Sequence, residues 1–274
     1  MMHHAAFELI EIPHTRQSGK NSADIRMVVD ALDPEFGRAI AHHGVWEPHI
    51  IHVIRSLLQP GQTFVDVGAN VGVMAFHAAS VVGPGGRVIA FEPNPDNADV
   101  FQRGLLANGF QNVRLFTWAA SDAYRLISLS RASNAKVRRG EAPLQYDSVV
   151  QADRLDTFLA SQERVDLIKI DIEGYERPAL EGLTETLARF RPHILCEFNP
   201  LCFGDLGYSL ADMADYVFTL TDRVEVIAHS TVRTPIDSPA ALIALWQQAD
   251  AENASRGVLA PGWTHFDLLF RAGG

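Results

Sequence analysis

The amino-acid sequence predicts a doubly wound α/β fold with a mostly parallel sheet. In the middle of the chain, short and mainly apolar runs alternate with helical patterns. Strands of this kind are buried on both faces, which is typical of a parallel sheet covered by helices. Five runs fit the pattern: Thr63–Val67, Arg87–Phe91, Val113–Trp118, Val165–Ile170 and Ile194–Phe198.

Length and composition indicate one large domain. The chain has 274 residues, of which 47% are hydrophobic and 20% charged, so it can bury a sizeable core. Asp33-Pro34 predicts the start of one helix, and Pro60-Gly61 ends another that begins at Trp46. We therefore expect residues 1–60 to form a helical cover packed on a core domain of residues 61–274.

Helix boundaries are visible between and after the central strands. Asn94-Pro95 begins a helix that Asn108-Gly109 ends, and leucines at helical spacing predict a second helix over Arg177–Phe190. Ser209, with Asp212 three residues later, resembles a capping box, and Ser238-Pro239 begins a long helix. Two further strands are expected at the end of the chain: Arg223–Ala228 and His265–Arg271.

Charge and cysteine content exclude several classes of function. The net charge is −10, which argues against non-specific electrostatic binding to nucleic acid or to an anionic membrane. Cys196 and Cys202 are the only cysteines, and no apolar run reaches the ~18 residues of a membrane span. We expect a cytoplasmic protein, for which a homodimer is an alternative to a monomer. The basic stretch Arg131–Arg139 is the local exception, either a solvated loop or a lid over an anionic substrate.

The first central strand runs directly into a glycine-containing turn, Phe64 to Gly72, and then into a helix. Gly68 and Gly72 let the backbone approach a ligand, and Asn70 tolerates the left-handed conformation. Ligands of open α/β sheets bind at such strand ends. Asn70 stands where a dinucleotide-binding fingerprint has its second glycine, which disfavours NAD. Asp66 before the turn suits the ammonium group of S-adenosylmethionine.

The next two strands end on residues that suit a nucleoside. Glu92 lies 24 residues after Gly68, where a carboxylate accepts hydrogen bonds from both ribose hydroxyls. The small residues after the third strand leave room for a flat ring, and a carboxylate there can accept from an exocyclic amine. The expected cofactor-binding residues at these two strand ends are Glu92, Pro93, Asn94, Ala120, Ser121 and Asp122.

Together these segments resemble the FkbM family of S-adenosylmethionine-dependent methyltransferases. The resemblance covers about residues 45–200 and rests on DVGANVG (66–72), AFEPNP (90–95), LIKIDIEGYE (167–176) and LEG (180–182), with RLDTFL (154–159) and EFNP (197–200) beside them. It implies the class I methyltransferase fold, Rossmann-like, with seven strands of which the last is antiparallel. It also implies O-methylation of hydroxyls on sugars, polyketides or other secondary metabolites.

The fourth strand ends with three ionisable residues, Lys169, Asp171 and Glu173, which are costly to bury unless paired or functional. We interpret Asp171 as the base or orienting group for the acceptor and also as a cofactor contact. Glu173 is then its partner or a cofactor contact, and Lys169 completes the catalytic group. No third ligand for a metal is evident, so none is expected. A network that only fixes the loop is the structural alternative.

Other candidates lie before the first strand and after the fifth. The resemblance places Glu47, in GVWEPH (44–49), over the cofactor, with His49 able to reach the substrate; helix capping and a solvated face are the alternatives. Glu197 and Asn199 end the fifth strand, where substrate contacts are expected. The resulting hypothesis is an O-methyltransferase acting on a small metabolite, glycan or glycolipid headgroup. Its rivals are an N-methyltransferase, a nicotinamide oxidoreductase and a catalytically silent cofactor-binding module.

Overall fold

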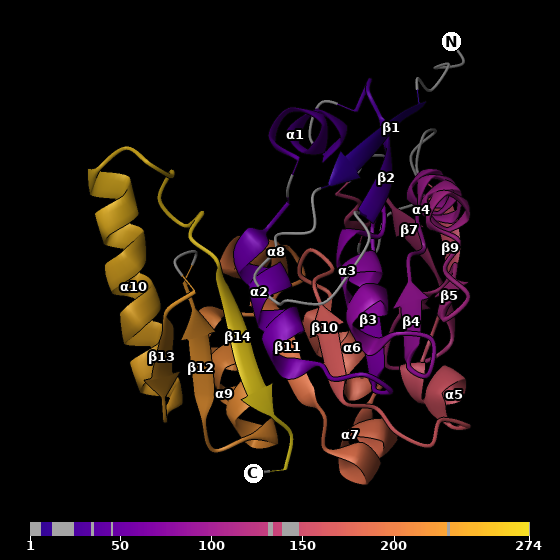
Figure 1. Cartoon of the computed structure of the whole chain (residues 1–274). Helices are drawn as coiled ribbons and strands as arrows, with labels where there is room; N and C mark the ends of the chain where they lie inside the picture. The colour runs from indigo at the N-terminus through magenta and orange to yellow at the C-terminus, as the bar shows by residue number, and fades with distance from the viewer. Residues whose placement is uncertain are drawn as a thin grey trace.

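The computed structural model describes residues 7–12, 25–33, 36–44, 46–130, 134–138, 148–228 and 231–273. Its centre is an eight-stranded sheet (Figure 1). The strands in spatial order are β13 (Arg233–Ile236), β12 (Val224–Ile227), β14 (Phe266–Arg271), β11 (His193–Phe198), β10 (Leu167–Ile170), β3 (Thr63–Val67), β4 (Arg87–Phe91) and β5 (Val113–Phe116). The five strands from β11 to β5 are parallel, which confirms the predicted doubly wound α/β class.

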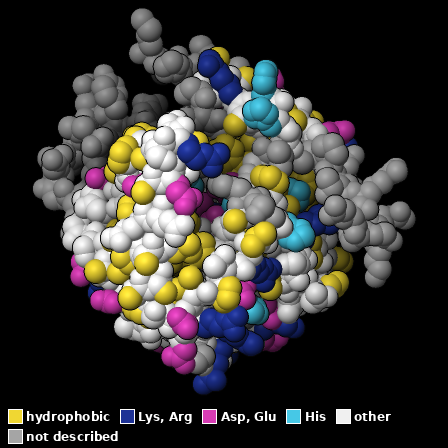
Figure 2. Space-filling view, turned by 90° about the vertical axis from the view of Figure 1, so that its left-hand side faces the viewer, with side chains coloured by type: hydrophobic (Ala, Val, Ile, Leu, Met, Phe, Trp, Pro, Cys, Tyr) yellow, Lys and Arg dark blue, Asp and Glu magenta, His cyan; other side chains and the backbone are white. Residues whose placement is uncertain are grey.

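The last strand is antiparallel, as expected. β14 pairs antiparallel with both β11 and β12. The sheet has one strand more than the seven expected, because β13 adds an antiparallel edge next to β12. Pro235 lies in this edge strand, where its missing N–H group disrupts no interior ladder. Figure 2 shows charged and hydrophobic side chains interspersed on the face of the molecule where α10 (Pro239–Ser255) and β13 lie.

Two helical layers bury the two faces of the sheet. One core cluster joins the sheet to α1 (Phe36–His43), α2 (Pro48–Leu57), α3 (Val73–Val82) and α4 (Pro95–Asn108). The other joins it to α5 (Leu155–Leu159), α6 (Glu176–Glu181), α7 (Thr184–Phe190), α8 (Pro200–Asp205), α9 (Leu210–Leu220) and α10. α3 is apolar nearly all round because α2 covers the side that the sheet does not (Figure 1). No helix of the described ranges is long and apolar enough to cross a bilayer.

The predicted helix starts are present. Asn94 and Ser238 each cap a helix through the side chain, and Ser209 forms the capping box with Asp212. The helix predicted over Arg177–Phe190 is instead two helices, α6 and α7. Gly182 separates them, and a Cβ atom there would lie 2.0 Å from the carbonyl oxygen of Ser121. This close approach of two backbone segments interrupts the leucine stripe.

The N-terminal cover is not purely helical. It contains an antiparallel pair, β1 (Phe7–Ile12) with β2 (Ile25–Asp30), besides α1 and α2. β2 lies along α4, and the Asn108 side chain accepts from the Arg26 amide over 2.8 Å and donates to the Arg26 carbonyl over 2.6 Å. Through these two bonds the Asn108 side chain, rather than a third strand, pairs the backbone amide and carbonyl groups of Arg26.

A second, four-stranded sheet lies between β5 and β10 in the chain. Its order is β6 (Ala119–Ala120), β9 (Ser148–Asp153), β7 (Arg125–Leu129) and β8 (Val137–Arg138). The Ser121 backbone amide donates to the Asp153 carbonyl over 3.0 Å. The segment that forms the small sheet, which we call the excursion, therefore begins and ends at adjacent positions. Of the basic stretch, Val137 and Arg138 form β8 of this sheet. Arg131, Arg139 and the side chain of Arg138 lie outside the described residues, whereas Lys136 Nζ lies 3.2 Å from Cys202 Sγ.

Candidate active site

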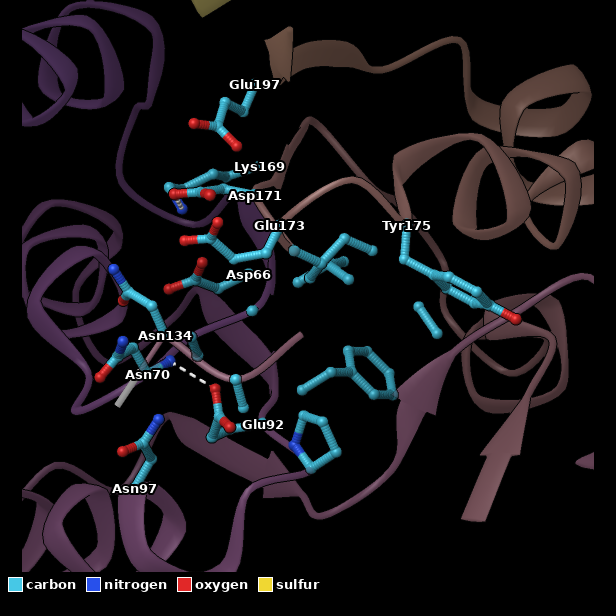
Figure 3. Close-up of a pocket in the computed structure, with 18 of the residues that line it drawn as sticks. Asp66, Asn70, Glu92, Asn97, Asn134, Lys169, Asp171, Glu173, Tyr175 and Glu197 are labelled. Atoms are coloured by element: carbon cyan, nitrogen blue, oxygen red, sulfur yellow. Dashed lines mark hydrogen bonds and ion pairs between the residues drawn. The ribbon is translucent and has the colours of Figure 1, made fainter. Parts of the chain in front are cut away.

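A cavity of about 280 Å³ opens at the carboxyl ends of the parallel strands (Figure 3). Residues far apart in the sequence meet there, because β3, β4, β10 and β11 all end at the same edge of the sheet. Many of the predicted site residues line it: Glu47, Asp66, Gly68, Asn70, Glu92, Pro93, Ala120, Lys169, Asp171, Glu173, Glu197 and Asn199.

The turn after β3 gives the cavity one wall. Gly68 has φ of 79°, and a Cβ atom there would lie 2.0 Å from the carbonyl oxygen of Asp171. Asn70 adopts the left-handed conformation with φ of 49°. The backbone N–H of Asn70 donates to Oε2 of Glu92 over 2.8 Å. The turn after β3 is therefore held against the end of β4 by a side chain that itself lines the cavity.

Glu92 is buried at the end of β4. Its Oε1 accepts from the backbone N–H of Asn94 over 2.8 Å, and its Oε2 accepts from the backbone N–H of Asn70. Burial raises the pKa of Glu92 to about 7, although the amides of Asn94 and Asn70 and the side chain of Asn97 lower it. Each carboxylate oxygen has a second lone pair, so Glu92 can still accept hydrogen bonds from a ligand in the cavity.

Asp66 is the most deeply buried acid of the site. It lies within β3 and has no exposed surface. No hydrogen bond of ordinary geometry reaches either carboxylate oxygen from the described residues. Burial raises the pKa of Asp66 to about 6; Lys169 lowers it and Asp171 raises it. A buried carboxylate without donors is costly, so this oxygen pair fits a ligand that brings a cation or hydrogen-bond donors.

Lys169 is the buried cation between these acids. Its Nζ lies 2.9 Å from Oδ2 of Asp171. Burial alone would lower the pKa of the Lys169 ammonium, but Asp171, Asp66 and Glu47 together raise it above its usual value. Lys169 therefore stays charged and holds the Asp171 carboxylate at the end of β10.

Glu197 and Glu173 lie on either side of Asp171 along the cavity (Figure 3). Glu173 has φ of 55°, and its Oε2 lies 3.3 Å from Cys202 Sγ. Burial and Asp171 raise the pKa of Glu173, whereas Cys202, Lys136 and His265 lower it. Burial and the neighbouring acids raise the pKa of Glu197 well above its ordinary value, with Asp171 the largest electrostatic cause.

Glu47 enters the cavity from the N-terminal cover. It precedes α2 with φ of 43° and makes no side-chain cap to that helix, so the capping alternative does not hold. Burial raises the pKa of Glu47 to about 8; Asp171, Asp267 and Asp66 raise it and Lys169 lowers it. A left-handed glutamate is strained, and here the strain places a carboxyl group on the cavity wall.

Five predicted site residues lie outside the cavity wall, each with a structural partner. Gly72 precedes α3 and packs against Phe76 and Phe101, and Asn94 caps α4. Ser121 and Asp122 bond to each other, and Asp122 also pairs with Arg125. His49 is buried and bonds to Asp267, so it is not on a solvated face either.

Several cavity residues carry no signal that the sequence alone reveals: Trp46, Asn97, Trp118, Asn134, Tyr175 and His265. Tyr175 shows why. It belongs to the segment quoted above, but its orientation depends on a contact of 3.4 Å between its hydroxyl and that of Ser121, 54 residues away. Glu176, fully buried, accepts from the amides of Ile172 and Gly174 and so shapes the turn that carries Glu173.

Comparison with known proteins identifies the family of the chain. The model of the methyltransferase FkbM domain matches residues 66–224, which is more than half of the chain and includes the ends of β3, β4, β10 and β11 at the cavity. The chain belongs to the FkbM methyltransferase family. It therefore carries an S-adenosylmethionine-dependent methyltransferase domain, and the predicted resemblance is confirmed.

Curated relatives of this FkbM-family chain include Methyltransferase sdnD of Sordaria araneosa, 27% identical over 156 residues, which are 44% of this chain and 60% of the relative. Protein-L-isoaspartate O-methyltransferase 1 of Archaeoglobus fulgidus is 30% identical over 79 residues, which are 28% and 37% of the two chains. The chain thus spans about half the length of the curated relatives it matches. The crystal structure of Methyltransferase FkbM from Methylobacillus flagellatus KT aligns with a TM-score of 0.47 and 14% identity, over 80% of this chain and 50% of that one.

S-adenosylmethionine is the cofactor of this FkbM domain, and the residues present fit it. The two unpartnered oxygens of Asp66 suit its ammonium group, and Glu92 has lone pairs for its ribose. Among the described residues, no group of three or more His, Cys, Asp or Glu side chains has an arrangement that could hold a metal ion.

Proposed function

We propose that this chain transfers the methyl group of S-adenosylmethionine to a hydroxyl of a small metabolite, sugar, glycan or glycolipid headgroup. The observation that carries the proposal is the set of carboxyl groups beyond the cofactor residues: Asp171, Glu173 and Glu197 lie at the ends of β10 and β11 on the same cavity (Figure 3). A hydroxyl acceptor needs a proton acceptor beside it, and the Asp171 carboxylate, paired with Lys169, provides one.

The cofactor supplies the methyl group as a sulfonium, and the chain's residues do the rest. Asp66 binds the ammonium, Glu92 binds the ribose, and Pro93 and Ala120 flank the adenine. Glu47 closes the cavity above them. Holding both reactants in line accounts for much of the rate in such displacements.

Asp171 orients the acceptor hydroxyl and accepts its proton. Lys169 keeps the Asp171 carboxylate in place through the 2.9 Å contact, and Glu173 is its partner on the acceptor side. During transfer the new oxygen–carbon bond forms as the carbon–sulfur bond breaks, and the proton of the hydroxyl passes to the carboxylate. A general base of this kind contributes about 10²–10⁴-fold to the rate.

The test separates cofactor residues from the proton acceptor. Calorimetry with S-adenosylhomocysteine should show weaker binding for Asp66→Ala and Glu92→Ala and unchanged binding for Asp171→Asn. Methyl transfer from S-adenosylmethionine to hydroxylated acceptors, followed as release of S-adenosylhomocysteine, should fall in Asp171→Asn. Equal affinity loss in all three variants contradicts this division of roles, and full activity of Asp171→Asn on an amine favours N-methylation.

For the cellular setting we propose the cytoplasm, supported by the two free cysteines. Cys196 and Cys202 are both buried and form no disulfide, which suits a reducing compartment. A homodimer stays a prediction, which sedimentation analysis of the purified chain would test.

A further inference from the structure

Glu197 lies at the end of the cavity farther from Glu92, and its carboxylate points into the cavity (Figure 3). Its Oε1 accepts from Nδ2 of Asn199 over 3.3 Å. Its Oε2 is shielded from solvent and has no hydrogen-bond partner among the described residues. Such an oxygen is costly to bury. A molecule in the acceptor end of the cavity that donates a hydrogen bond to Oε2 removes that cost.

Glu197 lies among other acids, whose repulsion opposes its ionisation. Its largest electrostatic neighbours are four acids: Asp171, Glu176, Glu173 and Asp267. Asp267 is its register partner across the antiparallel pair of β11 and β14. Asp171, Glu173 and Glu176 lie within six residues of one another after β10, and Asp267 comes from β14, so acids of two distant segments converge on Glu197.

Two histidines face these acids: His265 lines the cavity, and His49 bonds to Asp267. The two lysines near them already have other contacts: Lys169 Nζ bonds to Asp171, and Lys136 Nζ lies against Cys202 Sγ. Neither donates a hydrogen bond to Oε2 of Glu197. A neutral hydroxyl would supply a hydrogen bond there without offsetting the charge, and an anion would be repelled. An ammonium group supplies both the donor and the opposite charge, and hydrogen bonds between charged partners are the stronger ones.

We propose that the acceptor of this methyltransferase carries a protonated amine, which Glu197 binds together with Glu173 and Asn199. This inference rests on the proposed function and names its substrate class: amino alcohols and amino sugars. The ammonium anchors the molecule at the end of β11, and the hydroxyl that receives the methyl group faces Asp171.

Three small probes of matched size test the charge that the site recognises: 2-aminoethanol, ethylene glycol and glycolate. Each is added to the full chain saturated with S-adenosylhomocysteine, and binding is measured by saturation-transfer NMR. We expect at least a fivefold stronger signal per proton from 2-aminoethanol than from ethylene glycol, and less again from glycolate. Glu197→Gln should abolish this preference, and Glu173→Gln should reduce it. Glu185→Gln, an exposed acid on α7, should leave it unchanged.

Equal signals from the three probes, a preference for glycolate, or a preference that survives in Glu197→Gln would overturn the inference. Binding of S-adenosylhomocysteine to each variant, measured by calorimetry, shows that the variant is folded. If the wild-type chain binds S-adenosylhomocysteine but shows no preference for the amine, only the acceptor class is wrong. If it does not bind S-adenosylhomocysteine at all, the proposed function itself fails.

Discussion

Nε2 of His49 in α2 lies 3.0 Å from Oδ2 of Asp267 in β14, and this contact ties the N-terminal cover to the last strand of the sheet. His49 is buried, and Asp267 has a side-chain exposure of 18%. Glu47 lies two residues before His49, so the same contact fixes the segment that carries a cavity carboxyl group. His49 thus holds the Glu47 segment in place and does not itself line the cavity.

A double-mutant cycle measures this contact. His49→Ala and Asp267→Asn should each destabilise the chain, and their coupling free energy should be about 1 kcal/mol, measured by urea unfolding. Arg103 and Asp99, an exposed pair on α4, provide the control and should couple by about 0.3 kcal/mol. Equal coupling in the two pairs would show that the His49 contact is no stronger than a surface pair.

Asp66→Asn should weaken the cofactor without weakening the fold. The substitution removes a buried charge that lacks hydrogen bonds, so the chain without cofactor should unfold at the same urea concentration or higher. The affinity for S-adenosylmethionine should fall about tenfold or more, because the ammonium loses its counter-charge. Asp215→Asn, at an exposed position of α9, should change neither quantity. Loss of stability and of affinity together would assign Asp66 a structural role instead.

The stability of the chain without cofactor should depend on the proton of Glu92. Its pKa rises from 4.5 in the unfolded chain to about 7 in the fold, so the folded state binds more protons between these values. Stability from this group is therefore complete below pH 4.5 and is lost as the pH rises through 7, a change of about 3 kcal/mol.

Urea unfolding at pH 5 and pH 8, in the wild type and in Glu92→Gln, isolates that contribution. The fall in stability between the two pH values should be smaller in the variant, because glutamine does not titrate. Parallel pH profiles in the two proteins would show that Glu92 carries its charge in both the folded and the unfolded state.

Gly68 should be far less replaceable than Gly109, although both have positive φ. A Cβ atom at Gly68 would meet the Asp171 carbonyl oxygen at 2.0 Å, whereas one at Gly109 would meet nothing within 4 Å. Gly109→Ala should cost about 1–2 kcal/mol, the backbone strain alone. Gly68→Ala should cost clearly more and should weaken S-adenosylhomocysteine binding, measured by unfolding and calorimetry. Equal costs would mean that β3 and β10 can separate at this turn.

The sequence predicted what depends on local periodicity and on single strand ends. The central strands, the helix caps at Asn94, Ser209 and Ser238, and the cavity positions of Asp66 and Glu92 all follow from patterns a few residues long. It did not predict contacts between distant segments. The break at Gly182 depends on the backbone of Ser121, and the inward position of Tyr175 depends on the Ser121 hydroxyl.

The same limit explains the residues placed outside the cavity. From sequence, Asp122 follows a strand that should end at the cofactor, but Arg125 in the next strand draws its carboxylate away. His49 is near the site in sequence and in space, yet its imidazole ring is hydrogen-bonded to Asp267, 218 residues later. Such competition between partners is decided only when the whole chain has folded.

The excursion that forms the small sheet has a practical consequence. Its two ends meet at Ser121 and Asp153, Asn134 lines the cavity, and Lys136 lies against Cys202. The cofactor residues Asp66 and Glu92 lie on the main sheet instead. We therefore expect that residues 122–152 can be replaced as one segment by those of another family member. Such chimeras would inherit a new acceptor preference while retaining the cofactor affinity of the recipient.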